Sequence, residues 1–142
     1  KIHKTLIATT QIQRTKMSKK QLNKILLMSF LIGISAFIFD WLWHYFILNL
    51  IYKEPLSPLG YWFFKFFIGF ATSFIVLMFF KIKNIWVNSI NIGLGGAVIF
   101  ALVLTMFRSW INSNYNFLIH LPHFFAFGLS ALIILKLFKW RG

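Results

Sequence analysis

The chain has 142 residues, of which 59% are hydrophobic and only 12% are charged. Soluble domains contain about a quarter charged residues, so this composition excludes a soluble enzyme, a secreted toxin and a disordered tail. Lys and Arg number 15 against two acids, and cysteine is absent, which excludes disulfides and thiolate metal sites. Together these numbers predict an all-α, polytopic membrane protein.

The first element is a basic segment at residues 1–24, an N-terminal extension that precedes the apolar part of the chain. Four apolar stretches then follow, at residues 25–51, 61–80, 85–107 and 117–138. Each is about as long as the 20 or so residues that a helix needs to cross a bilayer. The sequence therefore predicts a four-helix transmembrane bundle over residues 25–142, with short connections. No segment of 20 to 50 residues repeats, so a solenoid is not expected.

The positive charges indicate how the bundle is oriented. Twelve Lys and Arg residues lie in the basic segment, in the connection at 81–84 and in the C-terminal tail, whereas Lys53, Lys65 and Arg108 lie on the other side. The positive-inside rule then places both termini in the cytoplasm. We expect the basic flanks to contact anionic lipid headgroups, and we expect no nucleic acid partner because no basic module is predicted outside the spans.

The first span carries an Asp-x3-His pattern, formed by Asp40 and His44. The i, i+4 spacing places both side chains on one helix face, and small residues continue that face toward the N-terminus. Small residues allow helices to approach closely in a membrane. Those predicted to do so in this chain are Gly33, Ala36, Gly69, Gly95 and Gly96.

The other spans add ionisable residues at a similar predicted depth. The full predicted cluster, in the outer half of the bilayer, is Asp40, His44, Lys65, Arg108, His120 and His123. An ionisable group inside a membrane costs at least about 2.5–3.5 kcal/mol on insertion scales, so each needs a compensating partner or a function. We therefore expect Asp40 to face the bundle interior, within reach of Lys65, Arg108 or a histidine.

Three interpretations of this cluster are compatible with the sequence. In the first, Asp40 forms a buried ion pair with Lys65 or Arg108. In the second, one carboxylate and three imidazoles bind Zn or Cu, with His44 and His123 as core ligands and Asp40 or His120 completing the shell. In the third, Asp40 and the histidines form a path for protons or ions.

Two local features of the spans carry their own expectations. Pro122 lacks an N–H, so it predicts either the first turn of the last helix or a kink just inside the membrane. The Phe-rich faces are expected to contact lipid or partner proteins. They are formed by Phe63, Phe64, Phe66, Phe67, Phe70 and Phe74 and by Phe124, Phe125 and Phe127.

The sequence favours a non-catalytic function, and no catalytic residues are assigned. Loops large enough to bind a soluble substrate are absent, so the leading expectation is an auxiliary or structural subunit of a larger membrane complex, with other membrane subunits as partners. One alternative is a homo-oligomeric transporter or channel for ions or small solutes that uses Asp40. The other is a membrane metal-binding protein that uses Asp40, His44, His120 and His123.

Overall fold

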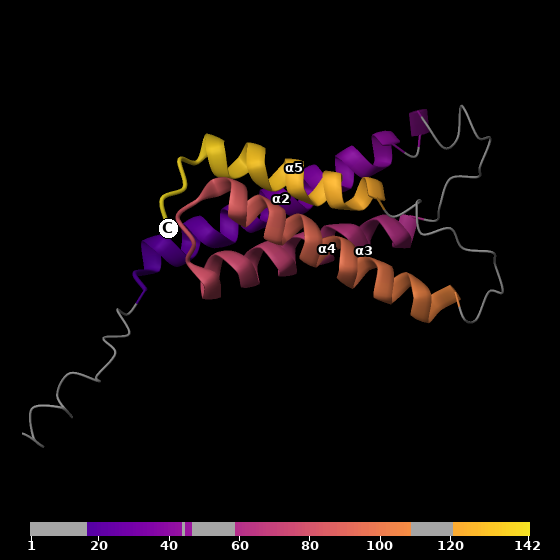
Figure 1. The fold of residues 1–142 in the computed structure, drawn as a ribbon, viewed down its shortest axis with the longest axis horizontal. Coiled ribbons are helices and arrows are strands. Elements are labelled where there is room, and N and C mark those ends of the chain that lie inside the picture. The colour runs from indigo at the N-terminus through magenta and orange to yellow at the C-terminus, as the bar shows by residue number, and fades with distance from the viewer. Residues whose placement is uncertain (1–16, 44, 47–58, 109–120) are drawn as a thin grey trace, which may run out of the picture.

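The computed structural model describes residues 17–43, 45–46, 59–108 and 121–142, which form an antiparallel bundle of helices without strands (Figure 1). The helices are α2 (Lys19–Trp43), α3 (Leu59–Ile75), α4 (Ile85–Arg108) and α5 (Leu121–Leu137). A π-helical segment, η2 (Val76–Phe80), continues α3 to the connection that precedes α4. The prediction of an all-α fold is confirmed for this part of the chain.

Three helical segments are long and apolar enough to cross a membrane, namely Lys19–Trp43, Phe63–Phe80 and Ile85–Val103. The described part of the last predicted span is a shorter apolar helix, Pro122–Leu137. Pro122 is the second residue of α5 as described, a position that suits a proline because N–H groups of the first turn have no partner within the helix. Residues 109–120 lie outside the described part, so the alternative of a kink at this proline stays a prediction.

Side-chain caps explain where two of the helices begin. The Ser18 hydroxyl accepts a hydrogen bond from the Gln21 amide at 3.2 Å, and α2 therefore begins six residues before the start predicted for the first span. Lys19, Lys20 and Lys24 thus belong to the first turns of a helix. At α4, the Asn84 side chain accepts hydrogen bonds from two backbone amides, at 2.9 and 3.3 Å, and the helix begins at the predicted residue.

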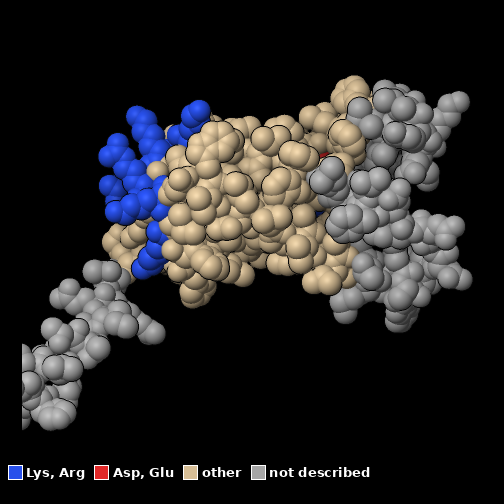
Figure 2. Space-filling view, viewed as in Figure 1, with Lys and Arg blue, Asp and Glu red and all other residues tan. Residues whose placement is uncertain are grey.

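One end of the bundle carries nearly all of the described basic side chains, as Figure 2 shows in blue. We call it the basic end. It is formed by Lys19, Lys20, Lys24, Lys81, Lys83, Lys136, Lys139 and Arg141. Hydrogen bonds tie its segments together, because the carbonyl oxygen of Ile82 accepts the Trp140 indole N–H at 2.9 Å and the Asn88 amide at 2.7 Å.

The two helix pairs, α2–α3 and α4–α5, bury equivalent positions. Each of the six buried residues described in α4 lies 60 positions after a buried residue of α2. Each of the seven buried residues described in α5 lies 58 positions after a buried residue of α3 or η2. In the bundle, α2 contacts α3 and α5, and α4 contacts the same two helices. The described bundle is therefore a tandem pair of helical hairpins. We refer to α2–α3 as the first hairpin and to α4–α5 as the second.

Glycines make the equivalent contact within each hairpin. A Cβ atom placed on Gly33 would lie 2.8 Å from the carbonyl oxygen of Phe66, and one placed on Gly93 would lie 3.0 Å from that of Phe124. At 2.8 Å from a backbone oxygen a Cβ atom would force the helices to shift, and at 3.0 Å it would be tighter than most real contacts, so glycine allows the paired helices to approach closely. Of the predicted small residues, Gly33 and Gly69 lie at the first of these contacts, and the alpha carbon of Gly33 is a neighbour of Gly69.

The centre of the bundle is filled by Phe127, which is 1% exposed. Its ring lies against two of the predicted packing glycines, because Cβ atoms placed on Gly69 and Gly96 would be 3.1 and 2.7 Å from it. The expectation that Phe127 faces lipid or a partner is therefore wrong, since two glycines on facing helices leave room for one large ring inside. Other members of the same Phe-rich faces do lie outside, among them Phe67 and Phe125, which are 61% and 51% exposed.

Candidate functional site

One buried residue from each helix lies at the same height in the bundle. Each of these residues lies fifteen positions from a residue near the basic end of its own segment. Asp40 follows Ile25 by fifteen residues, and Phe100 follows Ile85 by fifteen. Lys65 precedes Phe80 by fifteen residues, and His123 precedes Phe138 by fifteen. At about 1.5 Å per helical residue, this layer is about 22 Å from the basic end. We call Asp40, Lys65, Phe100 and His123 the Asp40 cluster. They occupy equivalent positions in the two hairpins, Asp40 with Phe100 and Lys65 with His123.

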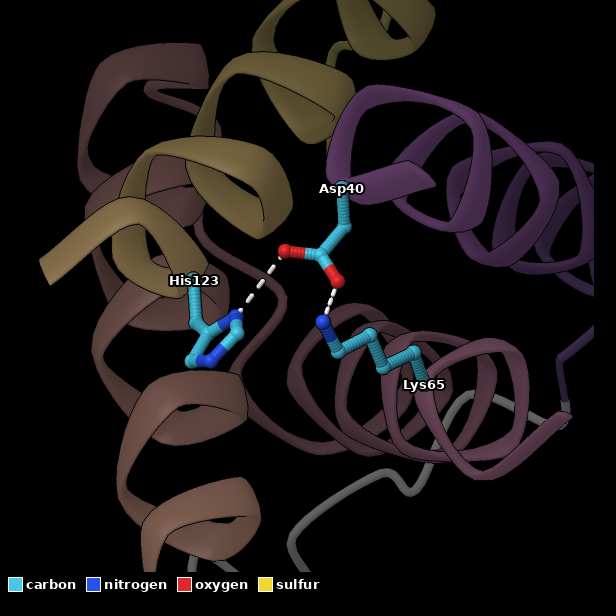
Figure 3. Close-up of polar contacts among 3 residues, drawn as sticks. All are labelled: Asp40, Lys65 and His123. Carbon is cyan, nitrogen blue, oxygen red and sulfur yellow. Dashed lines mark hydrogen bonds and ion pairs between the residues drawn. The ribbon is translucent and has the colours of Figure 1, made fainter. Parts of the chain in front are cut away.

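The Asp40 carboxylate holds the cluster together, as Figure 3 shows. Its Oδ2 atom forms an ion pair with the ammonium group of Lys65. Its Oδ1 atom lies 3.1 Å from Nδ1 of His123. Because an ionised carboxylate only accepts hydrogen bonds, Nδ1 carries the proton and donates in this contact.

Phe100 forms the remaining side of the cluster. Its ring centroid is 4.9 Å from Nζ of Lys65, which is the geometry of a cation–π interaction. The His123 ring packs edge-on against it, with centroids 4.4 Å apart and an interplanar angle of 67°. The Lys65 ammonium thus has a carboxylate on one side and an aromatic face on another.

Burial makes these contacts energetically important. Asp40, Lys65 and His123 are each 1% exposed. Removing one partner from a buried ion pair typically costs about 3–5 kcal/mol, because the other charge is left uncompensated. The cluster therefore links α2 to α3 by an ion pair and α2 to α5 by a hydrogen bond, and it contacts α4 through the aromatic ring of Phe100.

Of the six ionisable residues predicted to cluster, the structure brings Asp40, Lys65 and His123 together. His44 and His120 lie outside the described residues. Arg108 ends α4, and its side chain also lies outside the described part. Among the described residues, the first interpretation of the sequence agrees with the contacts of Asp40, which pairs with Lys65.

The metal interpretation stays a prediction. Within the described ranges, no group of three or more His, Cys, Asp or Glu side chains is placed to hold an ion. Two of the four ligands predicted for Zn or Cu, His44 and His120, lie outside those ranges. The contact between Asp40 and His123 is the part of the predicted set that the structure places.

Sequence reasoning missed Phe100, which carries no charge and is flanked by apolar residues on both sides in its span. Only its position indicates its role: it lies 60 residues after Asp40, and the same offset relates the buried residues of α4 to those of α2. The run from Gly93 to Gly96 was expected to pack closely against another helix, but its partner Gly128 was missed; a Cβ atom on Gly128 would lie 3.7 Å from the alpha carbon of Gly93.

The arrangement can do two things chemically. It can hold a compensated pair of charges at a depth where a lone charge is costly, and it can present a carboxylate acceptor and an imidazole beside an aromatic wall. Comparison with known proteins adds no assignment, because no protein-family model, curated protein or solved structure matches the chain.

Proposed function

We propose that the protein is a small integral membrane protein that acts as a non-catalytic auxiliary or structural subunit of a larger membrane complex. The observation that carries this proposal is the internal compensation of the Asp40 cluster. Its carboxylate contacts Lys65 and His123 of the same chain, so the charged groups serve to hold the helices in register.

The outer surface supports the same role. Large apolar side chains are exposed on each of the four helices, with Phe30, Phe67, Leu102 and Leu137 as examples. Such a surface suits both lipid and the helices of a neighbouring subunit. In this proposal the bundle crosses the membrane four times with both termini in the cytoplasm, and the basic end contacts anionic headgroups.

Affinity purification from native membranes in a mild detergent tests the subunit role. The tagged chain should co-purify with one or more other membrane proteins in a fixed ratio, and the Asp40→Ala variant should lose them because its bundle is weakened. A tagged membrane protein of unrelated sequence, expressed at the same level, controls for contaminants. Recovery of the intact chain alone, or only with copies of itself, would refute the proposal.

A second candidate function, a homo-oligomeric transporter for ions or small solutes that uses Asp40, is favoured by a different observation. Among the described residues, the buried hydroxyls of Ser29, Thr72 and Ser130 have no hydrogen-bond partner. In contrast, the hydroxyl of Ser73 donates to the carbonyl oxygen of Gly69 at 2.6 Å. Buried polar groups without protein partners commonly bind water or a ligand.

Flux measurements on proteoliposomes distinguish this candidate from the first. Transport activity should be lost in Asp40→Asn and reduced in Ser130→Ala, but retained in Ser73→Ala, whose hydroxyl is satisfied within its own helix. Proteoliposomes that pass neither protons nor alkali cations nor small solutes would exclude the transporter.

A further inference from the structure

A lateral groove opens between α2 and α5 at the height of the Asp40 cluster. Its cavity has a volume of about 470 Å³. We call it the α2–α5 groove. Its described lining residues are Phe39, Asp40, Trp43, Pro122, Phe125, Ala126 and Leu129. Pockets of roughly 300–1,000 Å³ with apolar walls and a few placed polar groups are typical binding sites for small molecules.

The walls of the groove face the surroundings of the bundle. Four of them, Phe39, Trp43, Phe125 and Leu129, are 38–51% exposed. These residues lie in two apolar helices, of which α2 is long enough to cross a membrane and the described part of α5 is shorter. In a bilayer, the groove would open toward the acyl chains. A ligand that fits these walls has a hydrocarbon body and enters from the lipid.

Asp40 is the charged residue in the described wall, and it determines the polar part of a ligand. Asp40 is 1% exposed, and its two carboxylate oxygens contact Lys65 and His123 inside the bundle. An ionised carboxylate has about four acceptor positions and no donor, so the group that complements its edge at the groove is a hydrogen-bond donor. The ion pair with Lys65 already balances the charge of Asp40. A cationic ligand would add a net charge in a region of low dielectric, whereas a neutral donor would not.

We propose that the α2–α5 groove binds a neutral, hydroxyl-bearing lipid. The hydrocarbon body packs against the aromatic side chains of Phe39, Trp43 and Phe125. The hydroxyl donates a hydrogen bond to the Asp40 carboxylate. This site goes beyond the proposed subunit role and does not depend on it, since a protein working alone would hold the same groove.

Photolabelling of the purified full chain in nanodiscs tests the site. The probe is a long-chain alcohol that carries a diazirine in its alkyl chain, and the matched control is its methyl ether, which lacks the donor. The alcohol should label residues of the groove, as mapped by mass spectrometry, and should compete about tenfold better than the ether, as expected for loss of a hydrogen bond to a charged acceptor.

Two tryptophan variants on α5 provide the control within the protein. Leu129→Trp fills the groove, whereas Ile133→Trp adds the same ring one turn further along α5, outside the described lining. The two positions are matched in exposure, at 45% and 44%. Labelling should fall about tenfold in Leu129→Trp and stay unchanged in Ile133→Trp.

Several results would overturn the proposal. Equal labelling by the alcohol and the ether would show that Asp40 recognises no donor, and this comparison needs no variant to fold. Equal labelling of the two tryptophan variants, or labels that map outside α2 and α5, would show that the groove is not the site. None of these outcomes bears on whether the chain co-purifies with partners, so the subunit proposal is tested separately.

Discussion

Removal of the Asp40 carboxylate should destabilise the bundle more than any comparable change at the surface. In Asp40→Leu the ammonium of Lys65 stays 1% exposed but loses its counter-ion. We expect the free energy of unfolding to fall by about 3–5 kcal/mol, the usual cost of an uncompensated buried charge. Lys65→Met should cost a similar amount because it removes the counter-ion of the buried carboxylate, which keeps its contact with His123. The free energy is measured by titration with a denaturing detergent in mixed micelles.

The double variant makes this prediction specific to the ion pair. Asp40→Leu combined with Lys65→Met replaces both charges by apolar groups of similar size. Its cost should be about 1–3 kcal/mol, because the His123 ring loses its contact with Asp40, and this is less than the cost of either single change. Glu54→Ala, which removes the other acid of the chain, should be tolerated and serves as the control. If the two single changes each cost less than about 1 kcal/mol, or if their costs simply add in the double variant, the reasoning is refuted.

Three further predictions concern packing and orientation. Gly33→Ala should lower the free energy of unfolding by about 1–3 kcal/mol, because its Cβ would lie 2.8 Å from a backbone carbonyl of α3. Gly128→Ala, whose Cβ would lie 3.4 Å from its nearest neighbour, should cost less than about 1 kcal/mol. Equal costs for the two variants would contradict the packing argument. Phe127→Ala should lower the free energy of unfolding by about 3–5 kcal/mol, because it leaves a central cavity. The change Phe67→Ala, at an exposed position, should cost about 0.5 kcal/mol or less. Thermal melts in detergent that rank the two variants in the opposite order would contradict this prediction. Because the chain has no native cysteine, Lys83→Cys provides a single thiol; it should react with a membrane-permeant maleimide but not with an impermeant one added to intact cells, and labelling from outside would overturn the cytoplasmic assignment of the basic end.

The helices were predictable because apolar length and turn residues act locally. The connection at 81–84 ends the second apolar stretch as expected, with Lys81 in the left-handed region at φ 47°. That Asp40, Lys65 and His123 lie at one height in the bundle was also predictable, since it follows from their distance along each apolar stretch.

The relation between the hairpins was not predictable by inspecting the sequence, because equivalent positions hold different residues. Phe127 in the second hairpin corresponds to Gly69 in the first, and Phe100 corresponds to Asp40. Space near the centre of the bundle admits one large ring, so a phenylalanine from one hairpin requires a glycine from the other. Because a large residue in one hairpin is matched by a small residue in the other, equivalent positions are not identical in sequence, and a search for repeats does not find them. For the same reason, the burial of Phe127 could not be predicted from its own hairpin.

The placement of the two opposite charges has a consequence for how the chain enters a membrane. Asp40 and Lys65 lie on successive helices of the first hairpin, so that hairpin contains both the acid and its counter-ion. In the membrane location proposed above, this hairpin would insert with the charges of Asp40 and Lys65 already balanced against each other. The second hairpin, which contributes an imidazole and a phenyl ring to the same layer, would then dock on a segment whose buried charges are paired.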